Sequence, residues 1–247
     1  MPRNGGGVSL LKAIFFDIDD TLYSTSEFAE VARERAIEAM IRMGLRMNSA
    51  DLKAELNEVV TEFSSNYEYH FDKLLQRVPR RFIKGINPAV LITAAVVAYH
   101  DTKFQKLKAY EDVLEVLRVL DNTDLVLGII TAGITVKQIE KLIRIEVLEY
   151  ISPNAIFVSD QIGISKPNVK LYQRACSDLN LKPGTTMYVG DNPANDIDPP
   201  NRIGMITVWN KRGGKHLNRT SRSKPKYEIH NFWDLLDILR EDFKLEV

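Results

Sequence analysis

Three aspartates and a threonine come directly after a short apolar segment at residues 13–16. The aspartates are Asp17, Asp19 and Asp20, and the threonine is Thr21. Carboxylates crowded within a few ångströms repel one another, so one must take up a proton unless a cation lies close by. Carboxylate oxygens, with water and a phosphate completing the shell, are ligands that Mg²⁺ prefers. This stretch therefore indicates a magnesium site, although D-x-D-D alone is often a turn or a capping cluster.

Three further polar groups lie at or just beyond later segments rich in apolar and β-branched residues. They are "TAG" (Thr131, Ala132 and Gly133), Lys166 in "GISKPN", and Asp191 with Asp196 in "GDNPAND". Taken singly, each has an ordinary explanation, because threonine is common in strands and G-D-N-P is a good turn sequence. The carboxyl ends of parallel strands, however, meet at one edge of a sheet. A parallel sheet would therefore bring all four groups into one site, where Lys166 balances the carboxylates.

The elements that must position these groups alternate along the chain. Segments typical of strands lie at 13–16, 125–130, 155–158, 186–190 and 205–209, and helical patterns lie near 111–120, 134–149 and 168–179. Such alternation is typical of a parallel sheet covered by helices on both faces. We therefore expect an α/β fold with a doubly wound, Rossmann-like parallel sheet.

Residues 24–103 have a different, almost entirely helical pattern. Apolar residues recur along 52–63 at the spacing of one helix face, behind a possible N-cap at Ser49. Asn87 and Pro88 predict a cap and first turn for a further helix. We expect an inserted helical cap domain, and the predicted domains are an α/β core at 1–22 and 104–247 and a cap at 23–103.

Composition excludes several classes of protein. The 247 residues are 45% apolar and carry no net charge, so no overall field favours nucleic acid or an anionic membrane as a partner. The longest nearly apolar run, 89–99, is about half of the ~20 residues that span a bilayer. The single cysteine, Cys176, rules out an internal disulfide and suits a reducing compartment, so a cytoplasmic location is expected. The basic stretch 211–226 is expected to be a solvated, mobile loop; oligomeric state is not indicated.

The segments "DIDDTL", "ITAG", "SKPN" and "GDNPAND", in this order and spacing, resemble the four motifs of the haloacid dehalogenase-like hydrolase superfamily. The resemblance is to the subgroup with a helical cap inserted after the first motif, and it extends over nearly the whole chain. Four ordered motifs are far more specific than any one of them. The resemblance implies a Mg²⁺-dependent phosphatase that acts on a small phosphorylated substrate.

Transferred residue by residue, the resemblance implies covalent phosphoryl transfer. Asp17 would attack phosphorus in line and form an aspartyl phosphate. Asp19 would protonate the leaving alkoxide and then deprotonate the water that hydrolyses the intermediate. Mg²⁺ would be held by the Asp17 carboxylate, the Asp19 backbone carbonyl and Asp191, while Asp196 would support the site from behind or through Lys166.

The resemblance also implies how the phosphoryl group is held. Thr131 and Lys166 would stabilise its oxygens, with the amides of Ala132 and Gly133 beside them. Many phosphatases of the family carry asparagine where this chain has Ala132, so one side-chain contact is missing. The position of Asp20 is often glycine in the family; its amide is expected to face phosphate and its carboxylate to have a solvated or capping role.

The predicted cap contains candidate substrate contacts. His70 and Tyr67 lie in the stretch 65–75, and His100 lies in 98–104. Both stretches resemble those of archaeal members of the superfamily described as glyceraldehyde 3-phosphate phosphatases, which makes this triose phosphate the specific substrate expected. A lone helical histidine is more often a hydrogen-bonded structural residue, so only the resemblance makes these side chains candidates.

Three alternatives remain at this stage. A 2-haloacid dehalogenase shares the nucleophile but needs neither an acid at Asp19 nor a metal ligand at Asp191. A phosphate-binding module without catalysis would have no need to retain Asp17, Asp19 and Lys166. A phosphotransferase would pass the same intermediate to another acceptor, and the sequence does not separate this reaction from hydrolysis.

Overall fold

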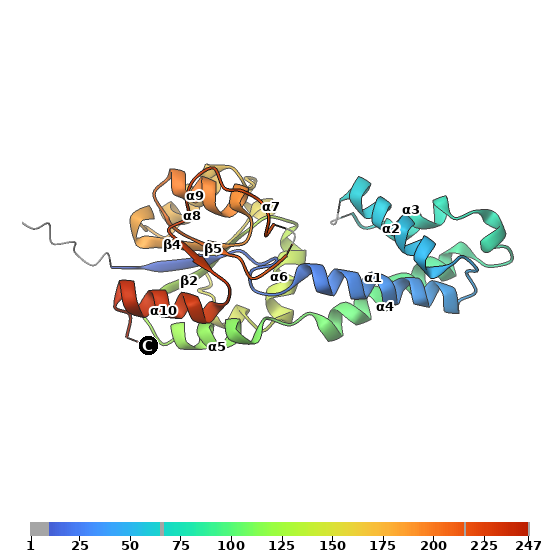
Figure 1. Ribbon diagram of the computed structural model, residues 1–247, viewed down its shortest axis with the longest axis horizontal. Helices are drawn as coiled ribbons and strands as arrows, with labels where there is room; N and C mark the ends of the chain where they lie inside the picture. Colours follow the sequence, from blue (N-terminus) through green and yellow to red (C-terminus); the bar gives the residue numbers. More distant parts are fainter. Residues whose placement is uncertain (1–9, 65–66, 215, 247) are drawn as a thin grey trace, which may run out of the picture. The chain divides into compact units, whose positions relative to one another are not determined.

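The computed structural model describes residues 10–64, 67–214 and 216–246 (Figure 1). The chain divides into two compact units, Met1–Thr25 with Lys108–Val247, and Ser26–Leu107. We refer to them as the larger and the smaller unit. None of the helices among the described residues is long and apolar enough to cross a membrane.

The larger unit contains a six-stranded, wholly parallel sheet in the order β3-β2-β1-β4-β5-β6. The strands are β1 (Ala13–Phe16), β2 (Val126–Thr131), β3 (Ile156–Val158), β4 (Thr186–Gly190), β5 (Ile206–Asn210) and β6 (Tyr227–Ile229). The chain runs outward from β1 in one direction and then returns to the other side of β1 with β4. Strand order therefore reverses between β1 and β4, the place where doubly wound sheets bind ligands.

Helices cover both faces of this sheet, which confirms the predicted fold class (Figure 1). The helices of the larger unit are α5 (Glu111–Leu120), α6 (Thr135–Arg144), α7 (Ser159–Ile162), α8 (Val169–Asp178), α9 (Asp198–Arg202) and α10 (Phe232–Phe243). Consecutive residues of β1 point to opposite faces. Phe15 packs in a buried cluster with Leu171 of α8, whereas the ring of Phe16 stacks on that of Phe232 of α10 at 5.7 Å. Both faces of β1 are thus core.

Several elements differ from the sequence-based expectation. The strand β6 and the helix α10 were not predicted. The helix expected over 134–149 ends at Arg144 and is followed by a separate helical turn at Leu148–Tyr150. Within the basic stretch, the expectation of a solvated, mobile loop is wrong for 221–223, because their polar groups donate to the Asp198 carboxylate at 2.8–3.2 Å. A buried carboxylate requires hydrogen-bond donors, and these bonds to Asp198 hold residues 221–223 in place.

All the regular secondary-structure elements described in the smaller unit are helices. Its helices are α1 (Thr25–Arg42), α2 (Ser49–Phe63), α3 (His70–Arg77) and α4 (Pro88–Lys106), with a short 3₁₀ turn at Arg80–Phe82. Asn48, rather than the predicted Ser49, caps α2 by accepting from the amide of Ala50 at 2.7 Å. Asn87 caps α4 in the same way, as predicted. The apolar faces of these helices share one buried core centred on Leu52, Leu74 and Leu91.

Candidate active site

Three aspartates from two neighbouring strand ends form a buried carboxylate cluster. Asp17 continues β1, since its amide donates to Val189 of β4 at 2.9 Å, and Asp191 directly follows β4. Asp17, Asp191 and Asp196 each offer one carboxylate oxygen, and these oxygens lie within 4.8 Å of one another. The parallel register explains the convergence, because Phe16 pairs with Val189 and both strands end at the same edge.

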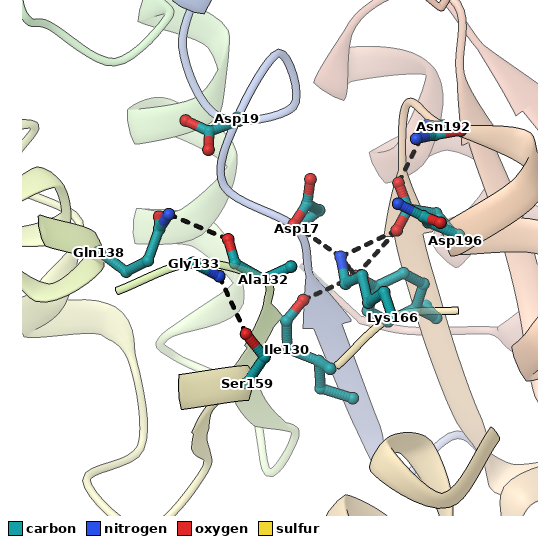
Figure 2. A network of polar contacts seen from close by, with 12 residues as sticks. Asp17, Asp19, Ile130, Ala132, Gly133, Gln138, Ser159, Lys166, Asn192 and Asp196 are labelled. Atoms are coloured by element: carbon teal, nitrogen blue, oxygen red, sulfur yellow. Dashed lines mark hydrogen bonds and ion pairs between the residues drawn. The ribbon is translucent and has the colours of Figure 1, made fainter. Parts of the chain in front are cut away.

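Lys166 lies against this cluster (Figure 2). Its Nζ atom is 2.7 Å from Asp17 Oδ1, 2.9 Å from Asp196 Oδ1 and 2.6 Å from the hydroxyl of Tyr188. That hydroxyl donates in turn to the carbonyl of Ile130 at 2.7 Å. The side chain of Lys166 is only 2% exposed. The ammonium is therefore held by three oxygens, one from the end of β1, one from β4 and one from the turn that follows β4.

The three carboxylates outnumber the single ammonium, and this excess of negative charge affects their pKa values. Burial, strengthened by Asp196 and Asp19 against the opposing effect of Lys166, raises the pKa of Asp17 to about 6. Burial and the neighbouring carboxylates raise the pKa of Asp191 to about 9. Burial would lower the pKa of Lys166, but its two carboxylate partners raise it instead. The cluster is thus electrostatically unfavourable without a further positive charge.

The donor set fits a hard divalent cation. Asp191 Oδ2 is buried and has no hydrogen-bond partner among the described residues. The backbone carbonyl of Asp191 accepts from Trp209 Nε1 at 3.0 Å, so the residue is held in place while this oxygen is left unused. Buried carboxylate oxygens are normally paired or bound to metal. Asp17 and Asp191 could therefore hold Mg²⁺.

Asp196 supports the cluster from a turn after β4. Its Oδ2 accepts from the amide of Asn192 at 2.9 Å, while its Oδ1 accepts from Lys166. The segment Pro193–Ile197 forms a single π-helical turn, and such turns are frequent at functional sites. The short helix α9 follows at Asp198. Asp196 is thus hydrogen-bonded to Lys166, and the supporting role that the resemblance implies for it remains a prediction.

The second predicted motif lies at the end of β2, the strand beside β1. Thr131 is buried at this strand end. The amide of Gly133 donates to Ser159 Oγ at 3.0 Å, and the carbonyl of Ala132 accepts from Gln138 Nε2 at 3.0 Å (Figure 2). The Gly133 amide, expected to lie beside phosphate, therefore already has an internal partner.

Asp19 is held apart from the other acidic side chains (Figure 2). Its two oxygens accept from the ammonium of Lys141 at 2.7 and 2.8 Å, and Oδ1 also accepts from the hydroxyls of Tyr23 and, at 3.2 Å, Thr25. Burial would raise the pKa of Asp19, but Lys141 and the two hydroxyls outweigh it and hold that pKa below its ordinary value. The side chain of Asp19 is not part of the metal-ligand cluster, and the ligand role of its backbone carbonyl remains a prediction.

Asp20 has a capping role rather than a solvated one. It is buried and adopts a left-handed backbone with φ of 54°, which explains why glycine suits this position. Its Oδ1 accepts from the amide of Thr25 at 2.8 Å, and its own amide donates to Thr25 Oγ1 at 3.2 Å. This reciprocal pair caps the start of α1.

The candidate substrate contacts of the predicted cap lie in the smaller unit. His70 Nε2 is 2.8 Å from the carbonyl of Ser64, and the ring of Tyr67 contacts that of His70 edge-on at 5.6 Å. His100 contacts Tyr99 in the same manner at 5.8 Å. These contacts are sufficient structural reasons for the three residues, so their substrate roles stay predictions. Residues 65 and 66 of this stretch lie outside the described residues.

Several side chains that contact the predicted site residues were missed by the sequence analysis, Lys141 and Tyr188 among them. Lys141 lies 122 positions from Asp19, and nothing in its helical stretch indicated the contact. Tyr188 was noted only as part of the strand 186–190. Its alternation with Met187 in a strand paired with β1 could have placed it on the same face as Phe15. The contact between Lys141 and Asp19, by contrast, has no local sequence signal, because the two residues are far apart in the chain.

A match to a family model identifies the family of this chain. The model described as haloacid dehalogenase-like hydrolase matches residues 14–209, which include every motif of the site. The chain belongs to this family. Asp17, Asp191 and Lys166 therefore all lie within the region that matches a haloacid dehalogenase-like hydrolase.

Relatives of this haloacid dehalogenase-like hydrolase extend over its length. A glyceraldehyde 3-phosphate phosphatase of Methanopyrus kandleri is 44% identical over 94% of this chain and 98% of its own, and one of Pyrococcus furiosus is 38% identical over 94% of each chain. Among solved structures, a HAD phosphatase from Thermococcus onnurineus has a TM-score of 0.66 at 21% identity, with 95% and 100% of the chains covered. A HAD-hydrolase of Bacillus subtilis bound to magnesium has a TM-score of 0.64 at 19% identity, with 93% and 99% covered.

Proposed function

We propose that this chain is a Mg²⁺-dependent phosphomonoesterase that works through an aspartyl-phosphate intermediate. The observation that carries the proposal is the buried cluster of Asp17, Asp191 and Asp196 against Lys166, with one Asp191 oxygen left without a partner among the described residues. A phosphoryl group carries its charge on several oxygens, so catalysis of its transfer is mainly positioning and charge stabilisation. The cluster supplies both.

The residues divide the work between them. Asp17 is the nucleophile, and Lys166, bonded to its Oδ1, holds that carboxylate in one orientation while compensating its charge. Asp19 exchanges the proton with the leaving group and with the attacking water. Thr131 donates its hydroxyl to a phosphoryl oxygen. Asp17, Asp191 and the carbonyl of Asp19 would hold Mg²⁺, which would neutralise negative charge at the transferring group.

Glyceraldehyde 3-phosphate is the substrate we propose. The support is the identity of 44% to the Methanopyrus kandleri phosphatase over 98% of that protein's length, together with similar relatives from other archaea. On this proposal the smaller unit is a cap domain, and His70, Tyr67 and His100 contact the triose. Such an insert can exclude water and select the leaving group.

The cluster also favours a phosphatase over the dehalogenase alternative. A carbon electrophile attacked by Asp17 requires no cation, and Asp191 would then add only repulsion to the site. Burial and the neighbouring carboxylates raise the pKa of Asp191 to about 9, so a charged carboxylate at this position is unfavourable without a cation. The phosphatase uses the same carboxylate as a ligand.

The test is phosphate release by the purified full chain after chelation and dialysis. A panel of phosphorylated two- to six-carbon metabolites, 4-nitrophenyl phosphate and a 2-haloacid is assayed with and without Mg²⁺. We expect phosphate release that depends on Mg²⁺, with the highest kcat/KM on glyceraldehyde 3-phosphate. Halide release without phosphate release would overturn the reaction, and a clearly better metabolite would overturn only the substrate.

A further inference from the structure

Lys141 of α6 connects two parts of the site that come from different strands. Its Nζ atom contacts Asp19 Oδ1 at 2.7 Å, Asp19 Oδ2 at 2.8 Å and Gln138 Oε1 at 3.2 Å. An ammonium group has three N–H donors and no acceptor. All three donors are thus used within the protein, so Lys141 has none left for a substrate phosphate.

Gln138 continues the connection to the end of β2. Its side-chain Nε2 donates to the carbonyl of Ala132 at 3.0 Å, and its side chain is buried (Figure 2). A Cβ atom on Gly133 would lie only 2.3 Å from this Nε2, so the close approach requires glycine. One chain of contacts therefore runs from Ala132 through Gln138 and Lys141 to Asp19.

The two oxygens of Asp19 are held unequally. Oδ1 accepts from Lys141, Tyr23 and Thr25, whereas Lys141 is the only donor to Oδ2 among the described residues. A carboxylate oxygen accepts about two hydrogen bonds. Oδ1 is therefore saturated, and Oδ2 has room for one more partner.

We propose that Lys141 is a positioning residue that orients the Asp19 carboxylate so that Oδ2 is the oxygen that exchanges a proton with the leaving group. This inference rests on the proposed function, in which Asp19 is the general acid and base. Proton transfer requires hydrogen-bond distance and alignment, and a misplacement of about 1 Å costs ~10²-fold in rate. Tyr23 and Thr25 hold only Oδ1, so without Lys141 the carboxylate could rotate about that anchor.

The experiment compares Lys141→Met, Lys141→Gln and Lys141→Arg with the wild-type chain. Each is assayed on an alkyl phosphate, whose leaving group needs a proton, and on 4-nitrophenyl phosphate, whose leaving group does not. We expect Lys141→Met to lower kcat on the alkyl phosphate by about 10–100-fold, with KM changed by less than about threefold and a smaller loss on the aryl phosphate. Lys141→Arg keeps the positive charge and can donate to both oxygens of Asp19, so it should recover most of the lost kcat.

A double-mutant cycle with Asp19→Asn separates positioning from direct substrate contact. Residues that act as a unit are strongly non-additive, so Asp19→Asn and Asp19→Asn/Lys141→Met should agree within about twofold on either substrate. Lys182→Met, which removes an exposed lysine of the same unit, is the matched control and should leave both rates unchanged. Thermal unfolding of every variant identifies loss of folding, and Lys141→Gln replaces Lys141→Met if that variant does not fold.

The outcomes separate this inference from the function beneath it. Suppose that the wild-type chain is active. The role of Lys141 alone would then be overturned if Lys141→Met and Lys141→Gln kept the wild-type kcat, if they raised mainly KM, or if they lost as much activity in the Asp19→Asn background as in the wild type. A wild-type chain that releases no phosphate in the presence of Mg²⁺ would overturn the proposed function and this inference with it.

Discussion

A Cβ atom on Gly190 would lie 2.5 Å from the Cβ of Asp196. Gly190 is the last residue of β4, and Asp196 lies in the turn that returns over this strand end. The absence of a side chain at Gly190 allows the approach that lets Asp196 reach the ammonium of Lys166 at 2.9 Å. The lack of a side chain at Gly190 therefore determines how the charged groups of Asp196 and Lys166 are placed.

We expect Gly190→Ala to impair both stability and activity. The added methyl group must displace Asp196, and overpacking of this kind costs about 1–3 kcal/mol. Displacement of Asp196 also releases Lys166, so kcat should fall by about tenfold or more. Urea unfolding and steady-state kinetics measure the two effects. Gly184→Ala is the control, since its Cβ would meet nothing closer than 4.0 Å; equal behaviour of both variants would argue against the contact.

Replacement of the nucleophile should abolish turnover without unfolding the chain. Asp17→Asn keeps the shape of the side chain and removes its nucleophilic charge, so we expect kcat to fall by at least ~10³-fold. Circular dichroism should remain that of the wild type. Incubation with substrate followed by acid quench should trap phosphate on the wild-type chain but not on Asp17→Asn. Labelling of the variant at the wild-type level would show that another residue is the nucleophile.

The chelated protein should lose stability as the pH rises. The folded state holds the Asp191 proton up to about pH 9, whereas an unfolded aspartate releases it near pH 4. Unfolding therefore releases a proton between these values, and the free energy of unfolding falls as pH increases through this window. Asp17, with a pKa of about 6, adds to the fall in the lower part of it. Urea midpoints measured after chelation from pH 5 to pH 9 test this slope.

Asp191→Asn isolates the contribution of Asp191 to that slope. Without a titratable carboxyl group at 191, unfolding releases no proton from this position, so the chelated variant should be about 1–3 kcal/mol more stable than the chelated wild type at pH 8. Excess Mg²⁺ should stabilise the wild type and not the variant. Asp124→Asn, at an exposed position, is the control for loss of charge. An unchanged slope in Asp191→Asn would contradict the assignment of the bound proton to Asp191.

The ion pair of Asp112 and Arg212 should stabilise the fold away from the site. Asp112 Oδ1 accepts from Arg212 Nη1 at 2.8 Å, and Oδ2 accepts from the amide of Phe232 at 2.6 Å. Burial would raise the pKa of Asp112, but these donors lower it. The stabilisation is therefore present above about pH 4 and is lost as pH falls below it. We expect Asp112→Asn to cost about 2–3 kcal/mol at pH 7, and to cost much less at pH 3.

Replacement of His70 tests the substrate role of the smaller unit. If His70 contacts the triose, His70→Ala should lower kcat/KM on glyceraldehyde 3-phosphate by about tenfold, while 4-nitrophenyl phosphate is hydrolysed at nearly the wild-type rate. Thr93→Ala, at an exposed position of α4, is the control. Equal losses on both substrates would instead assign His70 the structural role suggested by its contact with the Ser64 carbonyl.

The strand ends of the larger unit were open to prediction because their signals are local. Apolar runs at 13–16 and 186–190 correspond to β1 and β4 residue for residue. Asp17 and Asp191 follow them directly, and parallel pairing then requires that they meet. By contrast, β6 and α10 lie beyond the last motif, and the three residues of β6 are too few to show a period.

The sequence by itself determined the α/β class, the helical insert, and the identity of the groups gathered at one sheet edge, because alternation and spacing along the chain encode these directly. Only the tertiary structure decided how those groups are shared. It pairs Lys166 with both Asp17 and Asp196, assigns Asp19 to Lys141, and gives the Gly133 amide to Ser159. The physical reason is that a hydrogen bond depends on distances of about 3 Å between side chains, and packing of segments far apart in the chain sets those distances.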